Sequence, residues 1–139
     1  MSKIRVMLVD DHAMLRAGLQ MAVNSQPDME VVGQASTGSE AIGQAQACMP
    51  DVVLMDISLP DVGGAEVTEL IRQELPTLRV VAFTRHGDPS YLRRMLQAGA
   101  SGYVLKNADA GALLQAIRVV AAGGAYIDPV LAGSLVETV

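Results

Sequence analysis

The sequence has 139 residues, of which 50% are hydrophobic and 18% are charged, and its formal net charge at neutral pH is −5. This is the length of one ordinary domain, and the single cysteine, Cys48, excludes an intramolecular disulfide framework and a cysteine-rich zinc site. The acidic balance and an aromatic content of 3% argue against a surface that coats nucleic acid or stacks bases.

The sequence also lacks segments that would place it in a membrane or direct it to secretion. No stretch approaches the roughly 18 consecutive apolar residues of a membrane span. The first apolar run, at residues 6–9, ends at Asp10 and is shorter than the apolar region of about 7–15 residues in a signal peptide. We therefore expect a soluble, cytoplasmic protein.

Along the chain, short apolar runs typical of strands alternate with longer apolar stripes at helical spacing. In chain order, we expect five strands, at residues 4–9, 29–35, 52–55, 79–83 and 102–105. The intervals are expected to hold five helices, at residues 14–23, 37–48, 67–75, 88–99 and 113–121.

Local signals support several of these boundaries. Thr37 and Glu40 have the spacing of a capping box, in which Thr37 caps the helix and Glu40 reaches back to it. Pro50 should end this helix, because the residue before a proline avoids helical geometry. Asp88 followed by Pro89 is typical of an N-cap with proline at the first helical position.

Five strands alternating with five helices predict an α/β fold, a doubly wound parallel sheet covered by helices on both faces. We assign residues 1–122 to this domain. Residues 123–139 are too short and too broken by glycine and proline to form a sixth unit. We interpret them as a tail or linker.

The polar residues with useful chemistry stand where the predicted strands end. Asp10 and Asp11 follow the first strand, Asp56 the third, Thr84 the fourth and Lys106 the fifth. Ligands of open parallel sheets bind beyond the carboxyl ends of the strands. If the first and third strands are neighbours, three carboxylates converge and repel one another, which requires a compensating cation or raised pKa values.

Hard carboxylate oxygens suit Mg²⁺, and Lys106 would add a fixed positive charge. A phosphoryl group is the natural anion for such a site, because a carboxylate can attack it while the cations neutralise its oxygens. The sequence has no glycine-rich P-loop, so a nucleoside triphosphate is not the obvious donor. These patterns alone do not say which carboxylate is modified.

The same motifs resemble the signature set of response-regulator receiver domains, over about residues 3–122. They are Val-Asp-Asp-His ending at residue 12, Leu-Met-Asp-Ile-Ser-Leu-Pro at 54–60, Phe-Thr-Arg-His at 83–86 and Gly-Tyr-Val-Leu-Lys at 102–106. Details such as Ala-Gly-Ala-Ser-Gly-Tyr-Val-Leu-Lys resemble the NarL/FixJ subgroup, with a LuxR-type helix-turn-helix output domain. The resemblance implies a (βα)5 fold with flavodoxin-like strand order 2-1-3-4-5.

By this resemblance, Asp56 is the phosphorylated aspartate. Asp11 is the chief acidic ligand of Mg²⁺, Asp10 holds the metal's water shell, and Asp56 and the backbone carbonyl of Ser58 complete the metal site. No other cofactor is implied.

The resemblance also assigns the residues that respond to phosphorylation. Lys106 pairs with the phosphate, Thr84 hydrogen-bonds it, and Tyr103 is the switch aromatic. Taken alone, Thr84 could be a helix cap, and Tyr103 could be half-buried packing with its hydroxyl in water. His12 and His86 are expected to cap helices or lie at the surface, since no second histidine stands at ligand spacing.

The implied function is two-component signal transduction. A sensor histidine kinase donates the phosphoryl group, and the switched domain forms a homodimer or controls an output domain. DNA would be bound only through a helix-turn-helix domain beyond residue 139, with residues 123–139 leading to it. The chain would be a signalling phosphoacceptor that catalyses only its own phosphorylation and dephosphorylation, not an enzyme with a separate substrate.

Two alternatives stay open at this point. A small-molecule phosphatase or phosphotransferase could also form an aspartyl-phosphate, but its known pattern is Asp-x-Asp after the first strand, whereas Asp10 and Asp11 are adjacent. A stand-alone or phosphorylation-independent receiver would act by protein–protein interaction on the same fold. The complete set of site residues argues against this second alternative.

Overall fold

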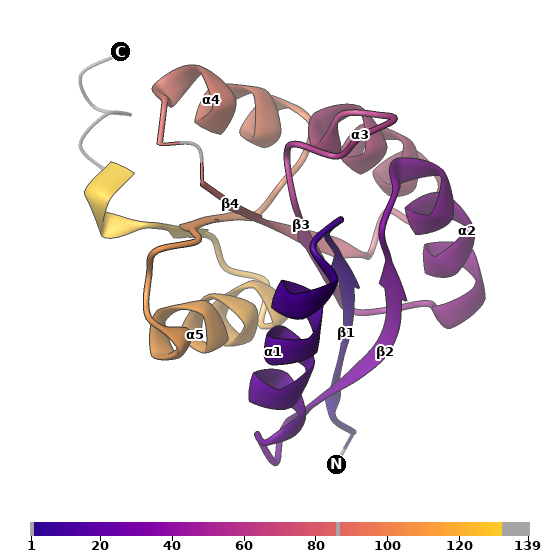
Figure 1. Cartoon of the computed structure of the whole chain (residues 1–139), viewed down its shortest axis with the longest axis vertical. Helices are drawn as coiled ribbons and strands as arrows, with labels where there is room; N and C mark the ends of the chain where they lie inside the picture. The colour runs from indigo at the N-terminus through magenta and orange to yellow at the C-terminus, as the bar shows by residue number, and fades with distance from the viewer. Residues whose placement is uncertain (1, 86, 132–139) are drawn as a thin grey trace.

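The computed structural model describes residues 2–85 and 87–131, which form a parallel sheet between two layers of helices (Figure 1). The strands of the described residues are β1 (Ile4–Val9), β2 (Met29–Ala35), β3 (Val52–Met55), β4 (Arg79–Thr84), β5 (Gly102–Leu105) and β6 (Tyr126–Ile127). The helices are α1 (Ala13–Asn24), α2 (Gly38–Cys48), α3 (Gly64–Glu74), α4 (Pro89–Gln97) and α5 (Ala110–Ala121).

The strand order is β2-β1-β3-β4-β5-β6, and every neighbouring pair is parallel. The predicted doubly wound sheet and the order 2-1-3-4-5 are therefore confirmed. The chain reverses direction across the sheet between β1 and β3, the position at which ligands of such folds bind.

Alternation along the strands divides the core in two. In β1, Val6 and Leu8 belong to a cluster with side chains of α1 and α5, whereas Met7 and Val9 belong to the cluster on the opposite face, with α2, α3 and α4. Both faces of β3 and β5 are buried. This is why these strands appear in the sequence as continuous apolar runs.

Most element boundaries follow the sequence signals. The amide of Glu40 donates to the Thr37 hydroxyl at 3.2 Å, as a capping box requires, but the Glu40 carboxylate accepts from Ser36, one residue before the predicted partner. α2 ends at Cys48, and Met49, before Pro50, has a left-handed φ of 50°. Asp88 caps α4, and Pro89 occupies its first turn.

The segment after α5 differs from the expectation. The sequence indicated only a tail or linker from residue 123, yet Tyr126 and Ile127 add a sixth strand beside β5, and Leu131 is buried in the core. The segment was missed because two strand residues have no periodicity of their own. Residues 132–139, with the rest of the expected linker, lie outside the described part of the chain.

Candidate functional site

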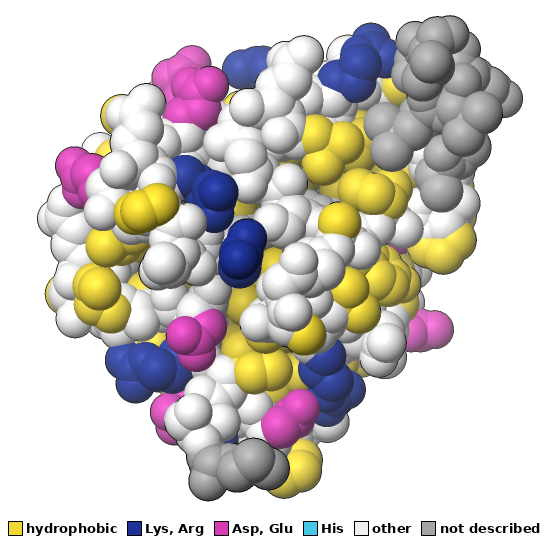
Figure 2. Space-filling view, turned by 180° about the vertical axis from the view of Figure 1, so that it is seen from behind, with side chains coloured by type: hydrophobic (Ala, Val, Ile, Leu, Met, Phe, Trp, Pro, Cys, Tyr) yellow, Lys and Arg dark blue, Asp and Glu magenta, His cyan; other side chains and the backbone are white. Residues whose placement is uncertain are grey.

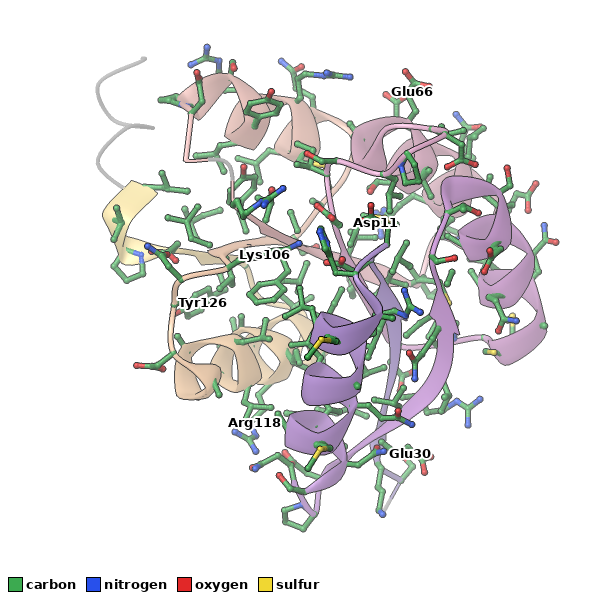
Figure 3. The ribbon with its side chains drawn as sticks, viewed as in Figure 1. Asp11, Glu30, Glu66, Lys106, Arg118 and Tyr126 are labelled. Atoms are coloured by element: carbon green, nitrogen blue, oxygen red, sulfur yellow. The ribbon has the colours of Figure 1, made fainter. Side chains whose placement is uncertain are left out.

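The carboxyl ends of β1, β3, β4 and β5 lie along one edge of the sheet, where the candidate site residues gather. Figure 3 shows Asp11 and Lys106 at this edge, whereas Glu30 and Arg118 lie toward the opposite end of the molecule. Asp10 and Asp56 are almost fully buried, and Asp11 is exposed. The fold thus brings together polar residues that are up to 96 positions apart in the sequence.

The three aspartates form a tight acidic group. One side-chain ligand atom from each of Asp10, Asp11, His12 and Asp56 lies within 4.8 Å of the others. The backbone fixes this arrangement, because the amide of Asp56 donates to the carbonyl of Val9 at 3.0 Å and thereby joins the end of β3 to the end of β1. β1 and β3 are neighbours, and the predicted convergence of Asp10, Asp11 and Asp56 is confirmed.

Lys106 places its ammonium between the two buried carboxylates. Its Nζ lies 2.7 Å from Asp10 Oδ2 and 3.3 Å from Asp56 Oδ2, and only 12% of the side chain is exposed. The shorter of the two contacts is to Asp10, a pairing that the sequence did not indicate. Three carboxylates against one ammonium leave a formal charge of −2, which a divalent cation would neutralise.

The Asp56 carboxylate is oriented from both sides. Its Oδ1 accepts a hydrogen bond from the amide of Ser58 at 3.1 Å, while its Oδ2 faces Lys106. The backbone amide of Lys106 donates in turn to the carbonyl of Thr84 at 2.7 Å, which ties the ends of β4 and β5 together. The Ser58 amide and the Lys106 ammonium therefore fix the orientation of the Asp56 carboxylate, with Oδ2 directed at the ammonium.

His12 is a member of the acidic group that sequence reasoning did not place there. It occupies the N-cap position of α1, as expected, and it is exposed. Its Nδ1, however, lies 3.1 Å from Asp10 Oδ1 and 3.2 Å from Asp11 Oδ1. The adjacency of His12 to two acids was the only available signal. His86, the other histidine considered, lies outside the described residues.

Thr84 and Tyr103 lie in the neighbouring strands β4 and β5, and both are fully buried. Their backbones are close in register, because Ala82 pairs with Tyr103 and Thr84 with Leu105. Burial raises the pKa of the Tyr103 phenol above its ordinary value of 10. Half-buried packing with the hydroxyl in water therefore does not describe Tyr103 in this structure.

The donor set fits Mg²⁺. Two ligands of one Mg²⁺ lie at most about 4.2 Å apart, since each Mg–O distance is about 2.1 Å. The acidic group is only slightly wider than this, so water molecules of the ion could fill the difference. Asp10, Asp11 and Asp56 are the residues that would hold the ion, and the charge of −2 described above is what it would neutralise.

The loop after β3 is fixed by two close contacts. A Cβ built on Gly64 would lie 2.4 Å from the carbonyl oxygen of Asp56, so only glycine permits α3 to approach the end of β3 this closely. At the other side of the loop, Asp61 accepts hydrogen bonds from the amides of Gly38 and Ser39 at the start of α2, at 2.7 and 3.1 Å. The loop that carries Ser58 is thus held between α2 and α3.

These hydrogen bonds hold the pKa of Asp61 well below its ordinary value of 3.8, the bond from the Gly38 amide contributing most. A depressed pKa stabilises the fold above pH 4, and this stabilisation is lost as the pH falls toward the folded-state pKa. We expect Asp61→Asn to unfold at lower urea concentration than the wild type at pH 7, with the difference shrinking as the pH falls from about 4 to about 2.

Urea titrations at several pH values measure this difference. Glu69→Gln, an exposed acid of α3, is the matched control and should show no such trend. A difference between Asp61→Asn and wild type that stays constant from pH 7 to pH 2 would contradict the assigned role of Asp61.

Two further observations bear on the class of protein. None of the helices in the described residues is long and apolar enough to cross a membrane. On the face shown in Figure 2, basic and acidic side chains are interspersed, and no continuous basic stripe crosses it. The fold and the site together define an α/β domain of flavodoxin-like topology, with an acidic group that could hold a metal ion and a lysine at the carboxyl edge of its sheet.

Comparison with known proteins identifies the family. The response regulator receiver domain family matches residues 6–118. The transcriptional regulatory protein DegU of Brevibacillus brevis is 40% identical over 136 residues, which are 98% of this chain and 58% of DegU. The response regulator GacA of Pseudomonas viridiflava is 42% identical over 132 residues, which are 95% of this chain and 62% of GacA.

Solved structures agree with this family. A two-component response regulator of the LuxR family from Aurantimonas sp. SI85-9A1 has a TM-score of 0.94 at 38% identity, over 99% of this chain and 98% of that one. The signal receiver domain of NarL from Mycobacterium tuberculosis has a TM-score of 0.85 at 32% identity, over 88% of this chain and 99% of that one.

This chain belongs to the response-regulator receiver domain family, and the Aurantimonas structure that it resembles is named as a member of the LuxR family. Receiver domains are signalling proteins, and they bind Mg²⁺ at an acidic aspartate cluster of the kind described above. The chain spans about three fifths of the length of the curated relatives it matches.

Proposed function

We propose that this chain accepts a phosphoryl group on Asp56 from a phosphohistidine of a sensor histidine kinase, with Mg²⁺ bound at the acidic group. The single observation that best supports this proposal is the position of Lys106 between Asp10 and Asp56. It puts the Asp56 carboxylate, which the Ser58 amide also orients, beside a fixed positive charge at the carboxyl edge of the sheet.

In the proposed reaction, a carboxylate oxygen of Asp56 attacks the phosphorus atom. The P–N bond of the phosphohistidine breaks, and the freed imidazole nitrogen keeps the electron pair of that bond. Lys106 retains its protons and neutralises charge on the transferring oxygens, and the bound metal would supply further charge neutralisation. Asp11, Asp56 and the carbonyl of Ser58 are the proposed ligands of the metal, with Asp10 acting through water.

The product adds about −1.5 to −2 charges at the end of β3. We propose that Thr84 moves to hydrogen-bond the new phosphate and that Tyr103 follows into the space that Thr84 leaves. Thr84 is the last residue of β4, and Tyr103 lies near the end of the neighbouring strand β5. The backbone amide of Lys106 joins the ends of these two strands, which supports a coupled movement of Thr84 and Tyr103. Such a local charge biases a two-state element of the fold.

The relatives support the wider role. DegU is named as a transcriptional regulatory protein, and the Aurantimonas structure is a LuxR-family response regulator. We propose that the switched receiver controls a LuxR-type DNA-binding output domain, and that DNA is contacted only through that domain. A phosphorylation-dependent homodimer is the expected intermediate of this control. We propose a cytoplasmic location, because the histidine kinase must reach Asp56.

The test is incubation of the chain with phosphoramidate, a small donor with the same P–N bond, followed by intact-mass measurement. We expect a Mg²⁺-dependent gain of one phosphoryl group in the wild type and none in Asp56→Asn. Asp51→Asn, at the opposite end of β3, is the matched control and should be modified normally. A normal mass gain in Asp56→Asn would overturn the assignment, and no gain in any protein would favour a phosphorylation-independent receiver.

A further inference from the structure

The segment after α5 contains the one buried acid of the described residues that lies outside the acidic site. Asp128 is 5% exposed, whereas the other buried acids are Asp10 and Asp56. Burying a carboxylate is costly unless its oxygens accept hydrogen bonds. The position of Asp128 therefore calls for an explanation that a tail or linker does not provide.

Each oxygen of the Asp128 carboxylate has a different partner. Oδ1 accepts from the amide of Val130 at 3.0 Å, within its own segment. Oδ2 accepts from the amide of Leu105 at 3.2 Å, a buried hydrogen bond that reaches back 23 residues to β5. The Val130 contact alone would be an ordinary helix cap. The Leu105 contact makes Asp128 a bridge between the segment and the strand.

The backbone of the segment adds to this bridge. The Asp128 amide donates to the carbonyl of Tyr103 at 2.8 Å, and β6 pairs with β5 through Tyr126 and Ile127. The segment is therefore hydrogen-bonded to Tyr103 and Leu105 of β5, and Leu105 immediately precedes Lys106. One of them, Tyr103, is the proposed switch aromatic.

Leu131 adds a contact on the other side. It is 4% exposed and belongs to the same hydrophobic cluster as Tyr103 and Leu105, on the α4 face of the sheet. A Cβ built on Gly87 would lie 3.9 Å from Cδ2 of both Leu105 and Leu131. Leu131 therefore lies next to the loop that follows Thr84. Figure 1 shows this segment between α5 and the β4–α4 region.

We propose that residues 126–131 form a latch that holds the unphosphorylated state, and that phosphorylation releases it. The latch is anchored by Asp128 on the backbone of β5 and by Leu131 beside the β4–α4 loop. These are the places where the proposed movements of Tyr103 and Thr84 would occur. This inference rests on the proposed function, because it requires a phosphoryl group at Asp56.

Coupling of this kind is reciprocal. If occupancy of the site opens the latch by a given factor, then opening the latch favours occupancy by that factor, typically about 5- to 150-fold, and a substitution that weakens the latch gives up to this gain. Asp128→Ala removes the bridge, and Leu131→Ala removes the apolar anchor. Neither residue belongs to the acidic site, so tighter binding in these variants cannot come from a new ligand contact.

The experiment measures amide hydrogen exchange of the full 139-residue chain with Mg²⁺, with and without beryllofluoride, which replaces the phosphoryl group on a carboxylate. Bound beryllofluoride is followed independently by fluorine NMR. With the ligand bound, we expect residues 126–131 to exchange at least about fivefold faster in the wild type. Asp128→Ala and Leu131→Ala should bind beryllofluoride more tightly by a similar factor.

Asp28→Ala is the matched control, because it removes a carboxylate that accepts hydrogen bonds from Arg118 at the far end of the molecule. It should change neither the exchange of residues 126–131 nor the affinity. If beryllofluoride binds but exchange in the segment is unchanged or slower, the latch is overturned while the proposed function stands. If no beryllofluoride binds in the presence of Mg²⁺, the proposed function fails and the latch fails with it.

Discussion

Replacing Lys106 by methionine is expected to lower the free energy of unfolding by about 3 kcal/mol in the absence of divalent cations. The substitution keeps most of the apolar stem but removes the ammonium that lies 2.7 Å from Asp10 and 3.3 Å from Asp56. Two carboxylates with 4% exposure then face each other without a counter-charge. Removing one partner of a buried ion pair typically costs about 3–5 kcal/mol.

Mg²⁺ should return part of this loss, because it would supply positive charge at the same carboxylates. Urea denaturation with and without Mg²⁺ measures both effects. Lys3→Met replaces a lysine that is exposed near the N-terminus, so its unfolding free energy should stay within about 0.5 kcal/mol of the wild type. Equal stability of Lys106→Met and wild type without Mg²⁺ would show that this ion pair does not hold the site together.

The same variant should also accept a phosphoryl group slowly. Loss of one preorganised group that stabilises charge in a transition state typically costs about 10²- to 10³-fold in rate. The rate of mass gain from phosphoramidate measures this effect. An unchanged rate in Lys106→Met would remove Lys106 from the proposed reaction while leaving its structural role intact.

Gly64→Ala is the second substitution with a large expected effect. We expect it to destabilise the fold, although helix propensity alone would favour alanine over glycine. Alanine is favoured over glycine in helices by about 1 kcal/mol, so the change should stabilise α3 if space allowed it. The new Cβ, however, would lie 2.4 Å from the Asp56 carbonyl oxygen and 2.7 Å from Cα of Ile57. Both are backbone atoms, which cannot move without displacing the end of β3.

We therefore expect Gly64→Ala to lose about 1–3 kcal/mol of stability, the usual cost of overpacking, and to be phosphorylated poorly. Gly43→Ala is the matched control, because Gly43 lies inside α2 and a Cβ added there would have no neighbouring atom within 4 Å. That variant should be stabilised by about 0.5–1 kcal/mol. Thermal or urea unfolding compares the two. A stabilised Gly64→Ala would contradict the close approach of α3 to Asp56.

The fold was predictable because its signals are local. β1, β3 and β5 have the bounds that their apolar runs indicated, because buried parallel strands are continuous apolar segments. β2 also has the predicted bounds, although its sequence pattern was more ambiguous because it is a partly exposed edge strand. The ends of α2 and α4 followed from Thr37, Pro50 and Asp88 for the same reason. The gathering of the aspartates and Lys106 at one edge also followed from the strand ends, once the strand alternation was clear.

The rest of the site depends on contacts that no local pattern encodes. β3 and β4 lie between the strands that end at Asp10 and at Lys106. The contact between these two residues therefore depends on how the long Lys106 side chain crosses the edge of the sheet, which no sequence pattern specifies. The need for glycine at position 64 comes from backbone atoms at the end of β3. Asp128 likewise has the sequence context of a simple cap before a proline, and its bond to Leu105 is visible only once β6 is placed beside β5.

The location of the phosphoryl group decides directly whether Asp56 is the phosphoacceptor. After incubation with phosphoramidate and Mg²⁺, reduction with borohydride converts an aspartyl phosphate into homoserine, which peptide mass spectrometry can locate. We expect a single modified residue, Asp56, and no modification without Mg²⁺. Modification at Asp10, at Asp11 or on a histidine, with Asp56 intact, would contradict this expectation.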